Sequence, residues 1–365
     1  GLNLWNKFRT CSSFVRSAGL AGSAPVKVGG SYFMPVACSD SLIILEYKDG
    51  DDTIIHKAVH VMGGKYVFYF LTLLEKGRLQ VLPLAYDVRK KEWYDNPGSG
   101  VRHFESGNDS ALDWQSYMFT FNTSCYGCHV SQLTTNFNLS DMSYNTVWRE
   151  PGINCETCHG PAGEHIKTFT GADSSEAVAD QKIISVKSFS PYQHNSSCGS
   201  CHAKMIPVVA SFVPGTGFYD AFDLVTLENH DFYPDGRDLG ENYTYTSWEM
   251  NRCKESSSLN CITCHTSSGR NKFRNEINGS CMPCHSDKVG NPSPHTRHDP
   301  SGKGSLCVSC HMPVTEFARM ERSDHSFRPP SPAATIEFGS PNACNICHSD
   351  KSPRWADEIV TKQRG

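Results

Sequence analysis

Apolar and polar positions alternate most clearly in the first part of the chain. Residues 41–47, 53–61, 66–73 and 79–86 alternate or run apolar, and Gly and Asp residues separate these segments. A period of two with such punctuation is typical of β-strands. We therefore predict a small N-terminal antiparallel β-sheet and assign residues 1–110 to a β-rich domain.

The remaining residues, 111–365, are expected to form loops and short α-helices in a second domain. One helix is predicted near 174–181, and a terminal one begins where Ser352 caps the helix and Pro353 occupies its first turn. The longest apolar candidate, 61–74, is interrupted by Gly63, Gly64 and Lys65. It falls short of the run of about 18 apolar residues that a spanning helix needs, so no membrane span is expected.

Composition argues against an ordinary aliphatic core. Only 38% of the residues are hydrophobic, whereas Gly numbers 29, Pro 20 and Cys 17. Side-chain burial is therefore not expected to be the main organiser of the fold, and another apolar material should fill the interior. The net charge of -4 shows no basic excess, so no nucleic-acid partner is expected.

The cysteines supply the candidate chemistry. Fourteen of the 17 form seven Cys-x-x-Cys pairs, each followed directly by a histidine. The pairs and their histidines are Cys125, Cys128 and His129; Cys155, Cys158 and His159; Cys198, Cys201 and His202; Cys261, Cys264 and His265; Cys281, Cys284 and His285; Cys307, Cys310 and His311; and Cys344, Cys347 and His348. Two thiols at this spacing can form thioethers with the vinyl groups of one haem, and the next imidazole then reaches the iron. The sequence thus predicts seven haem c groups.

Two other readings of the motif fit less well. Zinc ribbons use two Cys pairs for each metal and have no reason to place a histidine after every second Cys. A redox-active disulfide would explain one motif but not seven. The separations between successive motifs are markedly unequal, which excludes a solenoid of fixed period.

Nine histidines remain as candidates for the second axial ligands. His165, His295, His298 and His325 rank first, because they lie near or between motifs. The further candidates, from polar and turn-rich segments, are His103, His194 and His230. His56 and His60 are the expected spares, because they share one face of a predicted strand.

Most of the chain resembles the multihaem c-type cytochromes with doubled C-x-x-C-H motifs, in the clan of c-type nitrite reductases and hydroxylamine-oxidising cytochromes. The resemblance rests on GRLQVLPLAYDVRKKEWYD, NCETCHGPAGEH, YPDGRDLGENY, CVSCHMP, RSDHSF and SPNACNICHSDKSPRWA. It implies a multihaem cytochrome c fold wrapped around a haem chain. It also implies distal ligation by His165, by His295 or His298, and by His325.

The chain departs from this family's pattern in two places. The N-terminal region lacks a further motif and has only Cys11 and Cys38. WEMNRCK and CHTSSG stand where similar proteins carry histidines around the fourth motif. The distal ligand of the haem at Cys261 therefore remains open among Met250, His230 and a histidine of a neighbouring subunit.

Three cysteines lie outside the motifs, and six sequons occur along the chain. One disulfide among Cys11, Cys38 and Cys253 is compatible with assembly outside the cytoplasm, and the sequence does not choose the pair. Six Asn-x-Ser/Thr sequons, mildly suggestive of a glycosylated exterior, occur at Asn108, Asn122, Asn138, Asn195, Asn242 and Asn278.

The expected function is electron transfer through seven six-coordinate haems in extracellular or periplasmic respiration. The chain would act as a shuttle, a complex subunit or a subunit of a polymerising filament. Its partners would be redox proteins or extracellular electron acceptors, and it would form a homo-oligomer or filament. The alternative is an oxidoreductase that converts a small nitrogen or sulfur compound at one open haem, with the haem at Cys261 the first suspect. A third hypothesis makes residues 1–110 a docking module for β-strand addition; otherwise they cover one end of the haem stack.

Overall fold

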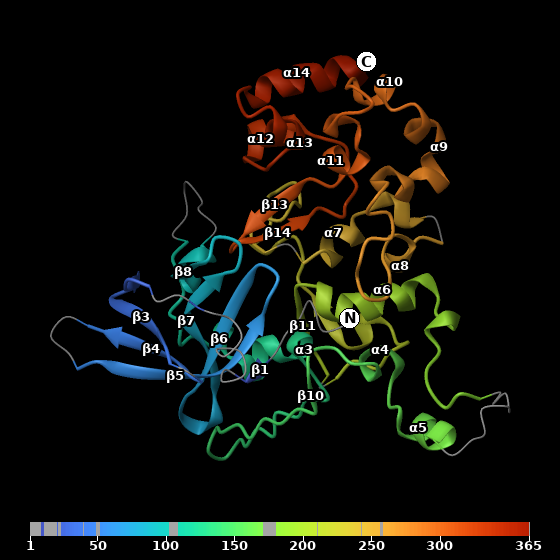
Figure 1. Ribbon diagram of the computed structural model, residues 1–365. Coiled ribbons are helices and arrows are strands. Elements are labelled where there is room, and N and C mark those ends of the chain that lie inside the picture. Colours follow the sequence, from blue (N-terminus) through green and yellow to red (C-terminus); the bar gives the residue numbers. More distant parts are fainter. Residues whose placement is uncertain are drawn as a thin grey trace. The chain divides into compact units, whose positions relative to one another are not determined.

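Figure 1 shows the computed structural model of the chain. It describes residues 9–10, 20, 23–38, 40–48, 52–101, 109–170, 180–209, 211–241, 243–255 and 258–364, with only the backbone at 9, 10 and 364. Outside these residues lie Cys11, His103, Asn108 and Asn242, together with most of the helix predicted near 174–181.

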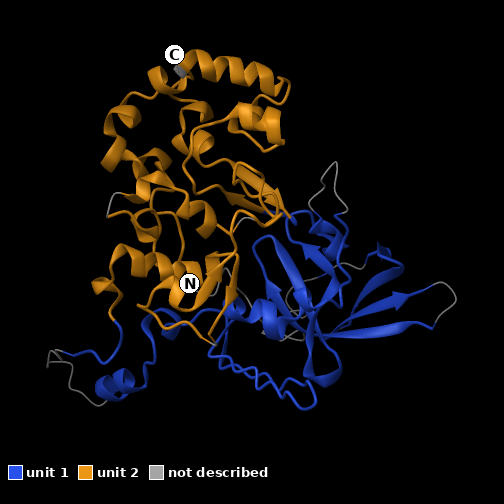
Figure 2. Cartoon of the chain, turned by 180° about the vertical axis from the view of Figure 1, so that it is seen from behind, with its two compact units in different colours: residues 1–184, 318–320 blue, residues 185–317, 321–365 orange. Residues whose placement is uncertain are grey.

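The chain forms two compact units, which are coloured separately in Figure 2. Unit 1 comprises Gly1–Ile184 and Ala318–Met320, and unit 2 comprises Ser185–Phe317 and Glu321–Gly365. Unit 1 contains the motifs at Cys125 and Cys155, and unit 2 contains the other five. The division into domains near residue 110 stays a prediction.

An eight-stranded sheet dominates unit 1, and all of its strand pairs are antiparallel. Seven strands pair in the order β2-β3-β4-β5-β6-β7-β8, and β1 pairs separately with β5. The strands are β1 (Arg9–Thr10), β2 (Val26–Val28), β3 (Ser31–Ala37), β4 (Leu42–Tyr47), β5 (Ile54–Gly63), β6 (Val67–Leu73), β7 (Leu79–Asp87) and β8 (Glu92–Asp95). The four predicted strands are confirmed as β4 to β7, but the expectation of a small sheet is wrong.

Strand β7 lies inside the sheet and is packed on both of its faces. All nine of its residues are buried, between β6 and β8. Leu82 and Leu84 join one apolar cluster with Phe33 and Phe70, whereas Leu79 joins a second. Both faces of the strand are therefore packed, as its continuous apolar run requires.

A side-chain core does organise this unit, which corrects the inference drawn from overall composition. Phe33, Leu42, Ile44 and Phe70 are at most 1% exposed and belong to one cluster. The hydrophobic residues are concentrated in the strands instead of being spread evenly along the chain. An average over 365 residues therefore hides a local core.

Short elements connect this sheet to the first two motifs. They are η2 (Glu75–Gly77), α2 (Asn96–Ser99), η3 (Tyr117–Phe119), η4 (Phe121–Cys125), α3 (Tyr126–His129), β9 (Val130–Ser131), β10 (Glu150–Pro151), α4 (Glu156–His159) and α5 (Gly163–Thr170). Strands β9 and β10 pair with each other directly after α3.

Helices and loops make up most of the chain after residue 185, as predicted. The elements are η5 (Val186–Ser188), α6 (Pro191–His202), β11 (Met205–Pro207), η6 (Phe218–Asp220), β12 (Phe222–Leu224), α7 (Tyr245–Glu249), η7 (Arg252–Glu255), α8 (Cys261–Cys264), η8 (Ile277–Ser280), α9 (Met282–Gly290), α10 (Ser293–Thr296), η9 (Lys303–Ser305), α11 (Cys307–His311), β13 (Val314–Phe317), β14 (Met320–Ser323), α12 (Pro332–Phe338), α13 (Ala343–Cys347) and α14 (Pro353–Arg364).

The terminal helix has the predicted start. Helix α14 begins at Pro353, and the Ser352 hydroxyl oxygen accepts a hydrogen bond of 3.2 Å from the backbone N–H of Trp355. Among the described residues, none of the helices combines the length and the apolar character needed to cross a membrane.

Candidate haem sites

Each Cys-x-x-Cys-His motif forms about one turn of helix. In four of the motifs the backbone N–H of the histidine donates to the carbonyl oxygen of the first cysteine, at distances of 2.8 to 3.1 Å. These four histidines are His159, His265, His285 and His348. Positions i, i+3 and i+4 of such a turn share one face, so two thiols and one imidazole point the same way. This is the arrangement that one porphyrin needs.

Backbone carbonyls orient several of the motif histidines. Nδ1 of His159 lies 2.9 Å from the carbonyl oxygen of Ile184, and Nδ1 of His311 lies 3.2 Å from that of Phe327. Nδ1 of His265 has a similar contact of 3.2 Å with Gly269. A carbonyl at Nδ1 fixes the proton there and leaves the Nε2 lone pair free to bind a metal.

Three motif histidines each face a second histidine from elsewhere in the chain. The ring centroids lie 6.3 Å apart for His265 and His325, 6.2 Å for His295 and His311, and 6.2 Å for His298 and His348. The two ring planes differ by 32°, 7° and 32° respectively. His325, His295 and His298 are three of the predicted distal ligands.

This separation suits two imidazoles that share one iron. A metal–imidazole bond is about 2 Å long and the nitrogen lies about 1.1 Å from the ring centre, so two trans ligands have centroids about 6 Å apart. Direct stacking of two rings would bring the centroids closer in many cases. The residues present therefore fit a six-coordinate haem at the motifs of His265, His311 and His348.

Carbonyls also hold two of the candidate distal histidines. Nδ1 of His325 lies 2.9 Å from the carbonyl oxygen of Ser323, and Nδ1 of His298 lies 2.6 Å from that of Thr296. As in the motif histidines, this leaves Nε2 available.

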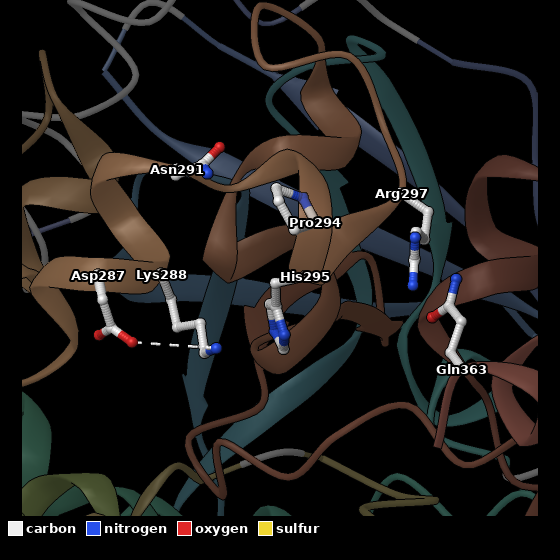
Figure 3. A pocket seen from close by; sticks show the side chains of 7 residues that line it. All are labelled: Asp287, Lys288, Asn291, Pro294, His295, Arg297 and Gln363. Atoms are coloured by element: carbon white, nitrogen blue, oxygen red, sulfur yellow. Dashed lines mark ion pairs between the residues drawn. The ribbon is translucent and has the colours of Figure 1, made fainter. Parts of the chain in front are cut away.

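His295 lines a cavity of about 290 Å³, shown in Figure 3. Its ring extends between Lys288 on one side and Arg297 and Gln363 on the other. The Lys288 ammonium lies 3.9 Å from the carboxylate of Asp287. Desolvation, followed by the neighbouring His311 and Lys288, lowers the pKa of His295. A neutral imidazole is the form that ligates a metal.

The surrounding protein keeps other motif histidines neutral as well. Desolvation lowers the pKa of His129 to about 4, and its buried Nδ1 has no hydrogen-bond partner within the described part of the chain. Desolvation, and then the positive charge of Arg322, lower the pKa of His202 to about 4. Both residues are thus in the form that ligation requires.

The structure does not bring the other candidate histidines to a motif histidine at this separation, within the ranges described above. His165 packs on Phe169 with centroids 4.7 Å apart, and its Nδ1 lies 2.7 Å from the Gln181 carbonyl oxygen. His194 packs on Phe189, and His230 is exposed.

The two expected spares lie in the sheet of unit 1. Nε2 of His56 lies 2.8 Å from a carboxylate oxygen of Glu46 on the adjacent strand, and both side chains are buried. His60 packs edge-on against Trp148 with centroids 5.2 Å apart.

The structure offers a further candidate for the distal ligand of the haem at Cys261. Among the described residues, the imidazole that faces His265 at this separation is that of His325, which adds a candidate to Met250, His230 and a histidine of a neighbouring subunit. The sulfur of Met250 instead lies beside Gly236, where it would be 3.1 Å from an added Cβ. His325 lies far from His265 in the sequence, beyond two further motifs, so no local spacing pointed to it.

Thiols of successive motifs lie next to one another in unit 2; after haem attachment these sulfurs would be thioethers. A hydrogen bond with Cys261, and then burial, raises the pKa of Cys198. Burial and then the adjacent Cys281 raise the pKa of Cys307 to about 11. Burial and then Cys281 raise the pKa of Cys264.

The last two motifs are adjacent in the same way. Burial raises the pKa of Cys310, and the nearby Cys344 and Cys347 raise it further. The five motifs of unit 2 therefore neighbour one another in their sequence order, which spacing alone could not reveal.

Two arginines of unit 2 carry buried nitrogens that lack hydrogen-bond partners among the described residues. They are Nε of Arg237 and Nη2 of Arg328. Arg237 pairs with Asp235, and Nη1 of Arg328 donates to the Asp235 carbonyl oxygen at 2.5 Å. Buried donors normally have acceptors, and the propionates of a haem are suitable anions.

The unpaired cysteines remain thiols where they are described. Cys38 and Cys253 are free and exposed, and Cys11 lies outside the described residues. A disulfide that includes Cys11 therefore stays a prediction.

Comparison with known proteins gives one family match and one structural match. Residues 100–160, which include the motifs at Cys125 and Cys155, match the family described as cytochrome c554 and c-prime. The structure is similar to that of the outer cell wall cytochrome OcwA, with a TM-score of 0.56 and 18% sequence identity over 84% of this chain and 75% of that chain. None of the curated proteins matches the sequence. At this identity the structural likeness shows a shared fold, and together the two matches support a multihaem c-type cytochrome.

Proposed function

We propose that this protein transfers electrons through seven haems c, one attached at each Cys-x-x-Cys-His motif. The observation that carries the proposal is the set of three histidine pairs at 6.2 to 6.3 Å, each of which joins a motif histidine to a distant one. Haem c supplies reversible one-electron chemistry, and imidazole at both axial positions favours a low potential.

The chain's own groups have separate tasks in this function. The paired thiols anchor each porphyrin, and the carbonyl at Nδ1 of residues such as His265 and His325 orients their rings. Where two imidazoles occupy both axial positions, no substrate can reach the iron. Such centres therefore pass electrons without chemical conversion of a ligand.

The order of the thiols supports a continuous path in unit 2. Cys198 lies close enough to Cys261, Cys307 to Cys281, and Cys310 to Cys344 for the second thiol to shift the pKa of the first. Since each thioether joins a vinyl group at the porphyrin edge, neighbouring thiols imply neighbouring porphyrin edges. We infer an electron path that follows the sequence order from the haem at Cys198 to the haem at Cys344.

Intact mass and a redox titration test the proposal together. The purified protein should exceed its polypeptide mass by seven haem increments, and its visible spectrum should change reversibly over a broad range of low potentials. A mass equal to the bare polypeptide, or a colourless sample, would refute the function. Fewer increments would refute the count of seven.

A second candidate function is an oxidoreductase with one open haem, and the observation that favours it concerns His202. Among the described residues no second imidazole lies opposite His202 at ligating distance, whereas Arg322 is close enough to lower its pKa. Arg322 pairs with Glu241 at 2.9 Å, and it would bind a small anionic substrate beside an open iron by exchanging that carboxylate for the substrate. The haem at Cys198, in place of the haem at Cys261, is therefore our first candidate for the open haem. Ferric EPR with a high-spin signal in the native protein would support this candidate, and a purely low-spin spectrum would exclude it.

The proposed setting is extracellular or periplasmic respiration, because c-type haem is attached outside the cytoplasm. Redox proteins or extracellular acceptors would exchange electrons with the chain, and a homo-oligomer or filament would extend the path. We also propose that the chain belongs to the clan of c-type nitrite reductases and hydroxylamine-oxidising cytochromes. Electron microscopy of native material would distinguish a filament from discrete particles.

A further inference from the structure

An asparagine recurs three residues before the first cysteine in three motifs. The segments NTSC, NSSC and NGSC place Asn122, Asn195 and Asn278 at this position, ahead of Cys125, Cys198 and Cys281. The same asparagines also read as glycosylation sequons. However, Asn122 is 0% exposed and Asn195 is 8% exposed, so these two amides face the protein interior.

Asn195 contacts the motif that follows its own. Its Oδ1 accepts a hydrogen bond of 2.9 Å from the backbone N–H of Cys261, the first residue of α8. The sulfur of Cys261 lies 3.2 Å from the same oxygen. A thioether cannot donate, so only the backbone hydrogen bond would persist after haem attachment.

Asn278 makes the equivalent contact between the motifs at Cys281 and Cys307. Its Oδ1 accepts a hydrogen bond of 2.9 Å from the backbone N–H of Cys307, the first residue of α11. Its Nδ2 donates to the carbonyl oxygen of Ser305 at 3.1 Å, which also holds the approach to that helix. The first amides of a helix lack partners within it, so each asparagine caps a helix of the next motif.

The thiol contacts coincide with these two hydrogen bonds. Cys198 neighbours Cys261 in the first pair, and Cys281 neighbours Cys307 in the second. An asparagine of one motif thus binds the first backbone N–H of the next motif at two places that are far apart in the sequence.

We propose that Asn195 and Asn278 are positioning residues that hold consecutive haems in two close pairs, Cys198 with Cys261 and Cys281 with Cys307. The proposal rests on haem attachment at these motifs. Each asparagine is fixed by its own motif and binds the backbone of the next one. It therefore sets the spacing between two porphyrins without touching either iron.

Asn122 provides a matched control within the chain. It has the same position relative to its motif, but its Oδ1 accepts from the backbone N–H of Leu79 at 2.7 Å, and its Nδ2 donates to Thr146 and Gly77. It ties its motif to strand β7 and to no second motif. Replacing it should lower stability without changing the spacing of a haem pair.

The experiment compares Asn195→Leu, Asn278→Leu and Asn122→Leu in the full haem-loaded chain. Leucine is of similar size and cannot accept a hydrogen bond, whereas Asn195→Asp retains an acceptor and serves as the conservative variant. Haem content is measured by intact mass, and magnetic coupling between neighbouring ferric haems by EPR during a redox titration.

We expect Asn195→Leu and Asn278→Leu each to lose the coupled signal of one haem pair, and a different pair in each case. Asn195→Asp should retain that signal, and Asn122→Leu should keep both pairs with a lower melting temperature. If Asn195→Leu does not fold, the partly exposed Asn278 carries the test. Unchanged coupling in the leucine variants at full haem load, equal loss in Asn122→Leu, or no coupling in the unaltered chain would overturn the proposal. Absence of haem from the unaltered chain would instead refute the proposed function.

Discussion

Removing one distal imidazole should change one haem in seven. In His325→Ala the ring opposite His265, now 6.3 Å away between centroids, is deleted, so one iron loses its sixth ligand. The other haems keep their axial ligands, because His295 and His298 face different motifs. The ferric EPR spectrum should therefore gain a high-spin signal that integrates to one iron in seven.

The control is His56→Leu, which removes a histidine that we expect to bind no haem. His56 contacts the buried carboxylate of Glu46 at 2.8 Å. Glu46 keeps the Ser31 hydroxyl at 2.9 Å and the Lys48 ammonium at 4.0 Å but loses one partner in a buried place, so the free energy of unfolding should fall by about 1–3 kcal/mol. Its EPR spectrum should stay as in the unaltered chain. A low-spin spectrum for His325→Ala at full haem load, or a high-spin signal in His56→Leu, would refute the reasoning.

Two further predictions concern stability. An added Cβ in Gly199→Ala would lie 2.8 Å from the Tyr245 ring and 3.0 Å from the Phe218 ring, so thermal unfolding should show a loss of about 1–3 kcal/mol; an unchanged melting temperature would contradict the packing. Burial raises the pKa of Asp87, but backbone N–H donors and Arg319 outweigh it and hold the pKa below its ordinary value of 3.8. A carboxyl with a lowered pKa contributes stability above pH 3.8, and this stability is lost as the pH falls through the folded-state pKa. Asp87→Asn should therefore be less stable than the unaltered chain at neutral pH and should lose less stability on acidification. Urea titrations at several pH values would show both differences.

The sheet was predictable where its pattern was long and regular. Strands β4 to β7 follow the alternation of residues 41–47 through 79–86 closely at both ends. Strand β3 contains Pro35, and β2 and β8 have three and four residues. Short or proline-containing strands give little periodic signal, so the sequence underestimated the sheet.

The proposed attachment sites can be predicted from the sequence because their chemistry is local. Two thiols and an imidazole in one short segment define a motif without reference to the fold. Axial partners are different: His325 reaches His265 across a long stretch of sequence, and the close neighbours His295 and His298 reach two different motifs. Only the tertiary structure determines such pairings.

The carboxylate beside His56 was also beyond the sequence. Glu46 lies on β4, and the pairing of Ile44 with His56 in the register of β4 and β5 brings the two side chains together. The expectation that His56 is spare came from strand position alone. The buried contact with the Glu46 carboxylate gives that residue a structural role.

A structure of the haem-loaded protein by cryo-electron microscopy tests the central claim most directly. It should show thioether-linked porphyrin at each Cys-x-x-Cys-His motif, with iron midway between His265 and His325, between His295 and His311, and between His298 and His348. Density without porphyrin at a motif, or any of these three pairs without iron between its rings, would contradict the account.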